Sequence, residues 1–170
     1  MSHFGAKVIY PPTIYPVLIK KIPTCIKNTF APEDAGSLIV SQKEEVEHGK
    51  ASAIAGISSI DGISLITLQG SGMVGVPGYS QRLFAALHQA GVNVILITQS
   101  SSEHNITVAI RQEAAAHAEK SINQVFEYEM RSGLLDPLQR EDGLSVVALV
   151  GESMRMHTGI SGKMFSALGK

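Results

Sequence analysis

The chain has 170 residues, of which 44% are hydrophobic and 17% are charged, and its formal net charge is -1. This is ordinary globular composition, and it provides no basic field that would attract nucleic acid or an anionic membrane. The one cysteine, Cys25, excludes an internal disulfide framework and a multi-cysteine metal site, and it fits a reducing, cytoplasmic compartment. No apolar stretch reaches about 18 residues and no signal-peptide pattern begins the chain, so neither a membrane span nor export is expected.

The N-terminal segment is rich in proline, with five of the seven prolines in the first 32 residues. At this density, proline is expected to block long regular structure until about Thr24. A short strand is predicted over 24–27, and a turn at 31–36 ends it. The charged run 42–50 is expected to be a solvated loop or linker.

Two β-rich runs, 54–60 and 63–69, flank the dipeptide Asp61-Gly62. Asp-Gly between apolar runs is a strong hairpin signal, because both central residues of such a turn need positive φ. A glycine-rich loop, 70–78, follows the second run. Apolar residues then recur at helical spacing, which predicts a helix over 79–90.

An almost wholly apolar run, 92–98, predicts a buried central strand. A polar turn leads to a strand over 106–110, and an amphipathic pattern predicts a helix over 112–131. The order strand-strand-helix-strand-strand-helix (ββαββα) predicts two helices on one face of an antiparallel sheet. Residues 53–132 are therefore expected to form a complete α+β unit of the ferredoxin-like class.

The pattern restarts with an apolar strand over 144–150, followed by a glycine-containing loop and a helix. A gapless alignment that pairs Leu68 with Leu149 also matches glycines, which indicates a tandem duplication. The further matched pairs are Gly70/Gly151, Met73/Met154, Gly78/Gly159, Ser80/Ser161, Phe84/Phe165, Ala86/Ala167 and Leu87/Leu168. Because the second copy stops after its first helix, the chain is expected to be a fragment of a longer protein.

The second copy has no hairpin partner directly before residue 144. Its partner strand is predicted to come from 24–29, so that the first copy is an insertion within the second. The incomplete copy should also expose apolar side chains, and large apolar patches drive association, so a dimer or higher oligomer is expected. The side chains concerned are Val146, Ala148, Phe165 and Leu168.

Residues 70–75 match G-x-G-x-x-G after a strand, the fingerprint of a dinucleotide-binding domain. The helix does not open at the last glycine of the motif, and no acid follows the next strand, so this hypothesis is the alternative. The favoured interpretation is a tight loop whose amides face a small anionic group at a helix N-terminus. Ser102, Glu103 and His104 have the residue types of a catalytic triad, but adjacent residues cannot easily form one.

Several segments together resemble a known family. Residues 4–11 resemble the end of the kinase domain of aspartate kinases, and 22–39 resemble the segment leading into their regulatory region. Gly70-Ser71-Gly72-Met73 and 94–103 resemble the first ACT domain of that region, while 144–168 resemble the first half of the second. Gly133-Leu134-Leu135-Asp136-Pro137-Leu138 favours the bifunctional type that is fused to homoserine dehydrogenase.

The resemblance implies a division into four parts. Residues 1–23 would be the tail of the kinase domain, 24–40 a strand segment completing the second ACT domain, 53–132 the first ACT domain, and 144–170 the truncated second ACT domain. It implies an allosteric regulatory region rather than an enzyme. The parent aspartate kinase would use ATP and magnesium outside this chain, and no cofactor or metal is expected within it.

The resemblance also implies feedback inhibition by an end-product amino acid, with threonine favoured over lysine, and a homodimer formed through ACT domains. An amide such as Gln99 both donates and accepts hydrogen bonds, which suits a ligand contact. The expected effector-binding residues are Gly70, Ser71, Gly72, Met73, Gly75, Pro77, Gly78, Asn93, Gln99 and Ser100.

Overall fold

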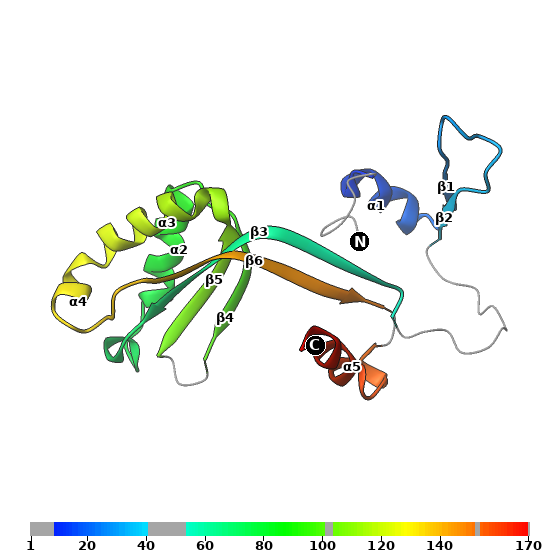
Figure 1. Cartoon of the computed structure of the whole chain (residues 1–170). Helices are drawn as coiled ribbons and strands as arrows, with labels where there is room; N and C mark the ends of the chain where they lie inside the picture. Colours follow the sequence, from blue (N-terminus) through cyan, green and yellow to red (C-terminus); the bar gives the residue numbers. More distant parts are fainter. Residues whose placement is uncertain (1–8, 41–53, 101–103, 152–153, 170) are drawn as a thin grey trace. The chain divides into compact units, whose positions relative to one another are not determined.

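The structure is a computed structural model that describes residues 9–40, 54–100, 104–151 and 154–169 (Figure 1). The chain divides into two compact units. One comprises residues 60–146, and the other comprises residues up to 59 together with residues from 147 onwards. No helix among the described residues is long and apolar enough to cross a membrane.

The unit of residues 60–146 is a four-stranded sheet with helices on one face (Figure 1). Its strands lie in the order β4-β5-β3-β6, and β5 is antiparallel to both of its neighbours. The chain order strand-helix-strand-strand-helix-strand confirms the predicted ferredoxin-like α+β class. The elements are β3 (Gly56–Gln69), the 3-10 turn η1 (Ser71–Met73), α2 (Tyr79–Gln89), β4 (Val94–Gln99), β5 (Asn105–Arg111), α3 (Gln112–Val125), α4 (Glu127–Arg131) and β6 (Gln139–Val150).

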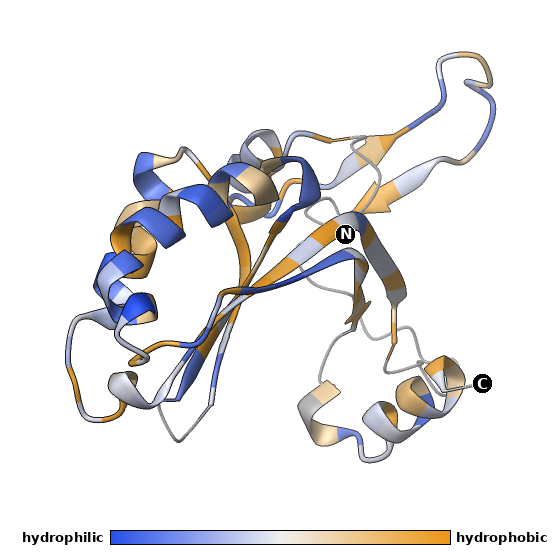
Figure 2. Ribbon diagram, turned by 60° about the vertical axis from the view of Figure 1, so that its left-hand side comes forward, coloured by the Kyte–Doolittle hydropathy of each residue, from blue (hydrophilic) through white to orange (hydrophobic). Residues whose placement is uncertain are grey.

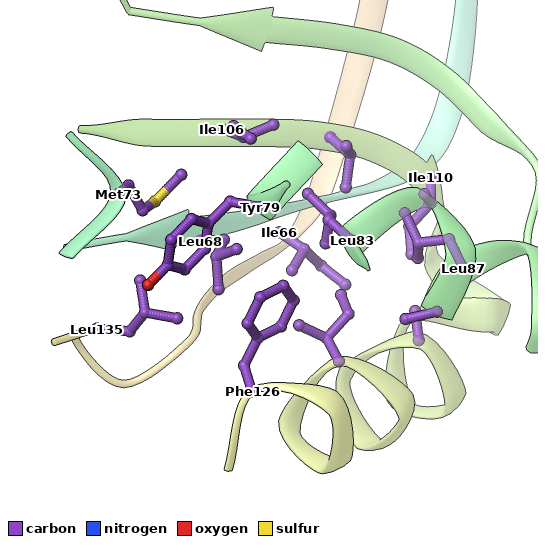
Figure 3. Close-up of a cluster of buried hydrophobic side chains, with 14 of the residues drawn as sticks. Ile66, Leu68, Met73, Tyr79, Leu83, Leu87, Ile106, Ile110, Phe126 and Leu135 are labelled. Carbon is purple, nitrogen blue, oxygen red and sulfur yellow. The ribbon is translucent and has the colours of Figure 1, made fainter. Parts of the chain in front are cut away.

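The core of this unit lies between the sheet and its two long helices (Figure 3). On α2, Leu83 and Leu87 lie one turn apart and are both buried, as the helical spacing predicts. On α3 the buried positions Ala115 and Ala118 are small, which lets this helix lie close to α2. Phe126, which is fully buried, fills the space beyond the end of α3. Fully burying one such side chain contributes about 1.5–3 kcal/mol.

The predicted hairpin at Asp61-Gly62 is wrong, because β3 runs through this dipeptide as one strand of 14 residues. Gly62 does have a positive φ of 67°. The left-handed residue therefore interrupts the regular extended backbone within β3 instead of reversing the chain. The fourth strand of the sheet is consequently β6, and the order ββαββα is corrected to βαββαβ.

The apolar run predicted as a central strand lies at the edge of the sheet. Only β5 flanks β4 among the described strands, and Leu96 and Ile97 are 51% and 54% exposed. An unbroken apolar run predicts a strand that is buried on both faces. In the structure the buried strand is instead β5, whose Val108 and Ile110 are fully buried. The apolar edge of β4 therefore has no cover from the described residues.

The two copies of the repeat meet through a reciprocal pair of hydrogen bonds. The sequence Asp-Gly-Ile-Ser at 61–64 recurs as Asp-Gly-Leu-Ser at 142–145. Ser64 Oγ donates to Asp142 Oδ1 at 2.5 Å, and Ser145 Oγ donates to Asp61 Oδ1 at 2.7 Å. The partners follow in opposite order along the two strands, so β3 and β6 are antiparallel. An exchange of equivalent residues of this kind is the pattern that a two-fold axis generates.

The other unit begins with the nine-residue helix α1 (Pro11–Ile19), within the segment where the proline density was expected to block long regular structure. Pro11 and Pro12 are tolerated because they lie in the first turn, where a missing N–H has no partner to lose, whereas Pro16 lies inside the helix and removes one backbone hydrogen bond. The short strand predicted at 24–27 is confirmed as β1 (Thr24–Ile26), and it pairs with β2 (Ser37–Ile39). The charged run 42–50 lies outside the described residues.

The predicted pairing of 24–29 with 144–150 is wrong, because β1 and β6 belong to different sheets among the described strands. The end of β6 instead accepts a hydrogen bond at Val150 O from Ala55 N, at 2.8 Å. The partner therefore comes from the beginning of the segment 53–132 that was predicted as the first copy.

The duplication is visible in the elements that follow each repeat strand. As β3 leads through η1 to a helix, β6 leads through η2 (Met154–Met156) to α5 (Ile160–Leu168). Both helices start after a glycine with positive φ, 104° at Gly78 and 85° at Gly159. On α5, which is coloured by hydropathy in Figure 2, Phe165 and Leu168 are 69% and 60% exposed. These two residues therefore have the exposure predicted for the second copy, while Val146 and Ala148 are half-buried.

Candidate functional site

A pocket of about 360 Å³ lies where the glycine-rich loop meets the end of β4, within the unit of residues 60–146. This volume is at the low end of the range of about 300–1,000 Å³ for small-molecule sites. The loop, the first turn of α2 and the neighbouring ends of β4 and β5 form its walls. The lining residues are Met73, Gly75, Val76, Pro77, Gly78, Tyr79, Ser80, Gln99 and Ile106.

The register of the sheet explains why two distant residues share this pocket. Gln99, the last residue of β4, is the Cα partner of Ile106 in β5. Ile106 is buried and forms an apolar part of the wall, whereas the Gln99 side chain is exposed and polar. Met73 and Tyr79 are buried from the loop side (Figure 3). The pocket thus has an apolar base and a polar rim.

The helix that opens at the pocket supplies its electrostatics. Gly78 is the N-cap of α2 and has a left-handed φ of 104°, a conformation that favours glycine. No side chain of the described residues caps this end, and the first N–H groups of a helix have no intrahelical acceptor. Among the described residues, the lining contains no Asp, Glu, Lys or Arg. An anionic group in this pocket would therefore meet backbone N–H groups and the positive end of the helix dipole.

Five of the ten residues expected from the sequence line the pocket together: Met73, Gly75, Pro77, Gly78 and Gln99. Asn93 directly precedes β4 and Gln99 is its last residue, so the two lie at opposite ends of the strand. Ser100 follows the strand, and its backbone N–H donates to Asn105 Oδ1 at 3.3 Å. Neither Asn93 nor Ser100 is among the described residues that line the pocket.

The other three expected residues, Gly70, Ser71 and Gly72, lie before the pocket in the chain. A side chain at Gly70 would meet the backbone of Leu135 at 2.6 Å, and one at Gly72 would meet Leu134 Cβ at 2.8 Å. These two glycines therefore allow the 134–135 segment to lie against the loop. Gly72 N donates to Leu134 O at 2.9 Å, which fixes that contact.

Four lining residues were missed in the sequence: Val76, Tyr79, Ser80 and Ile106. The first three lie within two positions of predicted ones and could have been found by extending the loop into the first helical turn. Ile106 depends on the pairing of β4 with β5, which no local pattern specifies.

The second copy has a pocket of its own, in the other unit, with a volume of about 320 Å³. It is lined by Met154, His157, Gly159, Ile160, Ser161 and Gly162. Met154, Gly159 and Ser161 are the repeat equivalents of Met73, Gly78 and Ser80. The duplicated strand-loop-helix segment therefore forms a pocket at the same place in both copies.

The two alternative sites receive no support. The sheet is antiparallel around β5, whereas a dinucleotide-binding domain needs adjacent parallel strands on either side of the glycine-rich loop. Of the residues with triad chemistry, Ser102 and Glu103 lie outside the described residues, and His104 is exposed.

Comparison with known proteins agrees with this geometry. Residues 66–126, which run from β3 through the end of α3, match the ACT domain family. The chain is 38% identical to a bifunctional aspartokinase/homoserine dehydrogenase of Haemophilus influenzae, over 99% of this chain and 20% of that protein. The chain spans about one fifth of the length of the curated relatives it matches.

Solved structures show the same fold. The aspartate kinase of Clostridium acetobutylicum superposes with a TM-score of 0.77 at 24% identity, covering 99% of this chain and 37% of that one. The E. coli aspartokinase III, in complex with lysine and aspartate, superposes with a TM-score of 0.66 at 25% identity, covering 89% and 32%. Residues 66–126 therefore belong to the ACT domain family, within a chain that is similar throughout to part of the bifunctional aspartokinase/homoserine dehydrogenases.

Proposed function

We propose that this chain is the regulatory region of an aspartate kinase and that it binds a free amino acid, which inhibits aspartate phosphorylation by feedback. The observation that carries the proposal is the pocket between the glycine-rich loop and Gln99 in the ACT domain. The structure of E. coli aspartokinase III in complex with lysine and aspartate supports an amino-acid ligand.

The chemistry of the pocket suits a free amino acid. Its carboxylate can accept hydrogen bonds from backbone N–H groups at the start of α2. Its ammonium group needs oxygen acceptors, which the Gln99 amide and backbone carbonyls provide. Because none of the described lining residues has a charged side chain, a zwitterion would bring no net charge that these residues leave uncompensated.

Threonine is favoured over lysine as the effector. A lysine side chain would bring a second ammonium group, and the described lining has no carboxylate to pair with it. The threonine hydroxyl can pair with Gln99 or Ser80, and its methyl group can contact Ile106. The volume of about 360 Å³ also suits a small ligand.

The whole protein is proposed to be an aspartate kinase fused to homoserine dehydrogenase, as the names of the relatives suggest. ATP and magnesium would then be bound outside this chain. Association into a homodimer through ACT domains is supported by the exposed apolar edge of β4, at Leu96 and Ile97. The cytoplasmic location stays a prediction.

Isothermal titration calorimetry of the 170-residue chain with threonine, lysine and methionine tests the effector. We expect a binding isotherm with threonine, a weaker one with lysine and none with methionine. Gln99→Ala should weaken threonine binding by about 1–3 kcal/mol, because a charged group of the ligand loses a hydrogen-bond partner. The matched control is Gln112→Ala. It removes a side-chain amide whose oxygen accepts a hydrogen bond from Gly143 N, and Gln112 is not among the described lining residues of the pocket.

The absence of heat with all three amino acids would contradict the proposal and favour an interaction domain without a small-molecule ligand. If the Gln99→Ala variant binds threonine as tightly as the wild type does, the chain would still be an amino-acid sensor, but this pocket would not be its binding site.

A further inference from the structure

Next to the pocket, but outside its lining, α2, α4 and the segment 134–136 meet at a junction. Arg82 lies on the first turn of α2, one turn after the pocket residue Tyr79. Its guanidinium pairs with the carboxylate of Glu129 on α4, and the Glu129 side chain is only 12% exposed. The second nitrogen of the guanidinium, Nη2, donates to Val125 O at 2.7 Å.

The aromatic surroundings fix the orientation of Arg82. The rings of Tyr79 and Phe126 are stacked with centroids 5.9 Å apart. The Arg82 guanidinium lies 4.5 Å from the Phe126 ring centroid and 5.9 Å from that of Tyr79. Such cation–π contacts add to the ion pair. The first turn of α2 is therefore fixed by the Glu129 carboxylate, which is not among the described lining residues of the pocket.

The backbone of the same glutamate holds the other side of the loop. Glu129 O accepts hydrogen bonds from Leu134 N at 2.9 Å and Leu135 N at 3.1 Å. Leu134 O in turn accepts the N–H of Gly72 at 2.9 Å. Asp136 N donates to Gln69 O at 2.9 Å, which joins the same segment to the end of β3.

Glu129 thus contacts both segments that pack against the pocket loop: the first turn of α2 and the segment 134–136. Through its side chain, Glu129 fixes the helix turn that follows the loop. Through its carbonyl, it fixes the 134–136 segment against which the loop begins. We propose that Glu129 and Arg82 are positioning residues that set the geometry of the effector pocket without touching the ligand. This inference rests on the proposed function of the pocket.

The charge state of the pair is consistent with this role. Hydrogen bonding to Arg82 lowers the pKa of Glu129 from its ordinary value, so the carboxylate is charged at neutral pH. Its second oxygen, Oε2, is buried and has no hydrogen-bond partner among the described residues. The carboxylate therefore depends on Arg82, and removing the arginine would leave a poorly compensated charge.

Glu129→Gln is the informative variant, because it keeps the backbone carbonyl and the side-chain shape and removes only the charge. We expect threonine binding to weaken by at least about fivefold, the lower end of couplings between distinct sites. Arg82→Lys keeps a positive charge but loses the planar two-armed geometry, so its affinity should lie between those of the wild type and Glu129→Gln.

The matched control is Glu119→Gln. Glu119 on α3 pairs with Arg140 at 3.1 Å, and neither residue is in the described pocket lining. This variant removes an ion pair from the same unit, at a glutamate that is 35% exposed and whose arginine partner also pairs with Asp142. Its threonine affinity should equal that of the wild type, even if its melting temperature falls as much as that of Glu129→Gln.

A measurement without ligand separates this inference from the proposed function. The amide resonances of Gly75 and Gly78, recorded by heteronuclear NMR on the free chain, should shift in Glu129→Gln and stay in place in Glu119→Gln. Unmoved resonances in Glu129→Gln would overturn the positioning role, as would equal loss of affinity in both variants. If the wild-type chain binds none of the amino acids but these resonances shift, the positioning role stands and the proposed effector fails.

Discussion

Gly70→Ala should destabilise the unit of residues 60–146 although Gly70 does not line the pocket. The added Cβ would meet Leu135 Cα at 2.6 Å and Leu135 Cδ2 at 3.0 Å. The nearer of these atoms belongs to the backbone, which cannot move aside as a flexible side chain can. The backbone at Gly70 has a φ of 162°, an extended conformation open to any residue, so the cost comes from the steric contact alone.

The size of the stability loss in Gly70→Ala depends on how far the 134–136 segment must shift. Overpacking a core position costs about 1–3 kcal/mol. A shift of the 134–136 segment would also weaken the hydrogen bonds Gly72 N to Leu134 O and Asp136 N to Gln69 O, and each contributes about 0.5–1.5 kcal/mol. We therefore expect the free energy of unfolding to fall by about 2–6 kcal/mol.

Urea denaturation followed by circular dichroism measures this loss as a lower midpoint at an unchanged slope. The control is Gly162→Ala in α5, where the new Cβ would meet no heavy atom of the described residues within 4 Å beyond its chain neighbours and the backbone of its own helix. Alanine in a helix interior should stabilise by roughly 0.5–1 kcal/mol relative to glycine. A Gly70→Ala chain that unfolds at the wild-type midpoint would refute the close packing of this segment against the loop.

Three further outcomes are expected. Phe126→Ala empties a fully buried position and should cost about 3–5 kcal/mol of unfolding free energy in the same urea titration; a smaller loss would contradict its central place in the core. Ser64→Ala should cost about 1 kcal/mol, because Ser64 is fully buried, whereas the equivalent Ser145→Ala at an exposed position should cost less; equal losses would contradict the difference in burial. Since its pairing with Arg82 lowers the folded-state pKa of Glu129, its contribution to stability is complete above its ordinary value of 4.5 and is lost as the pH falls through the lower folded value. Acid titration of the melting temperature should therefore be flatter in Glu129→Gln than in the wild type, and identical profiles would contradict this assignment.

The local parts of the fold could be predicted from the sequence because they depend on local spacing. Leu83 and Leu87 gave the face of α2, and the glycines on either side of the loop gave its place between strand and helix. The repeat located the second strand-loop-helix segment, which the structure forms as β6, η2 and α5. These features need only periodicity and backbone preference.

Strand pairing could not be predicted in the same way. Asp61-Gly62 has the residue types of a hairpin turn, and Gly62 takes the positive φ that such a turn needs. Whether the chain reverses there depends on the competing pairing of β3 with β6, whose residues are about 80 positions away. The edge position of β4 likewise depends on which strand lies beside β5, not on the apolar residues of β4 itself.

For the candidate site, Gln99 and the loop were found because polar residues at a strand end and glycines before a helix carry their own signal. Gly70 and Gly72 were predicted as ligand contacts, and that role stays a prediction. Their contacts with Leu134 and Leu135 were not foreseeable, since the 134–135 segment reaches the loop only through the tertiary fold. Arg82 and Glu129 were missed for the same reason.

The pairing of β3 with β6 also has a consequence for synthesis of the chain. Ser64 and Asp142 are 78 positions apart, and Asp61 and Ser145 are 84 apart. At translation rates of about 5–20 residues per second, β6 is made roughly 4–16 s after β3. During that interval one edge of β3 has no native strand beside it, and an unpaired edge is a template for pairing with other chains. The nascent protein is therefore most exposed to aggregation before residue 145 has left the ribosome.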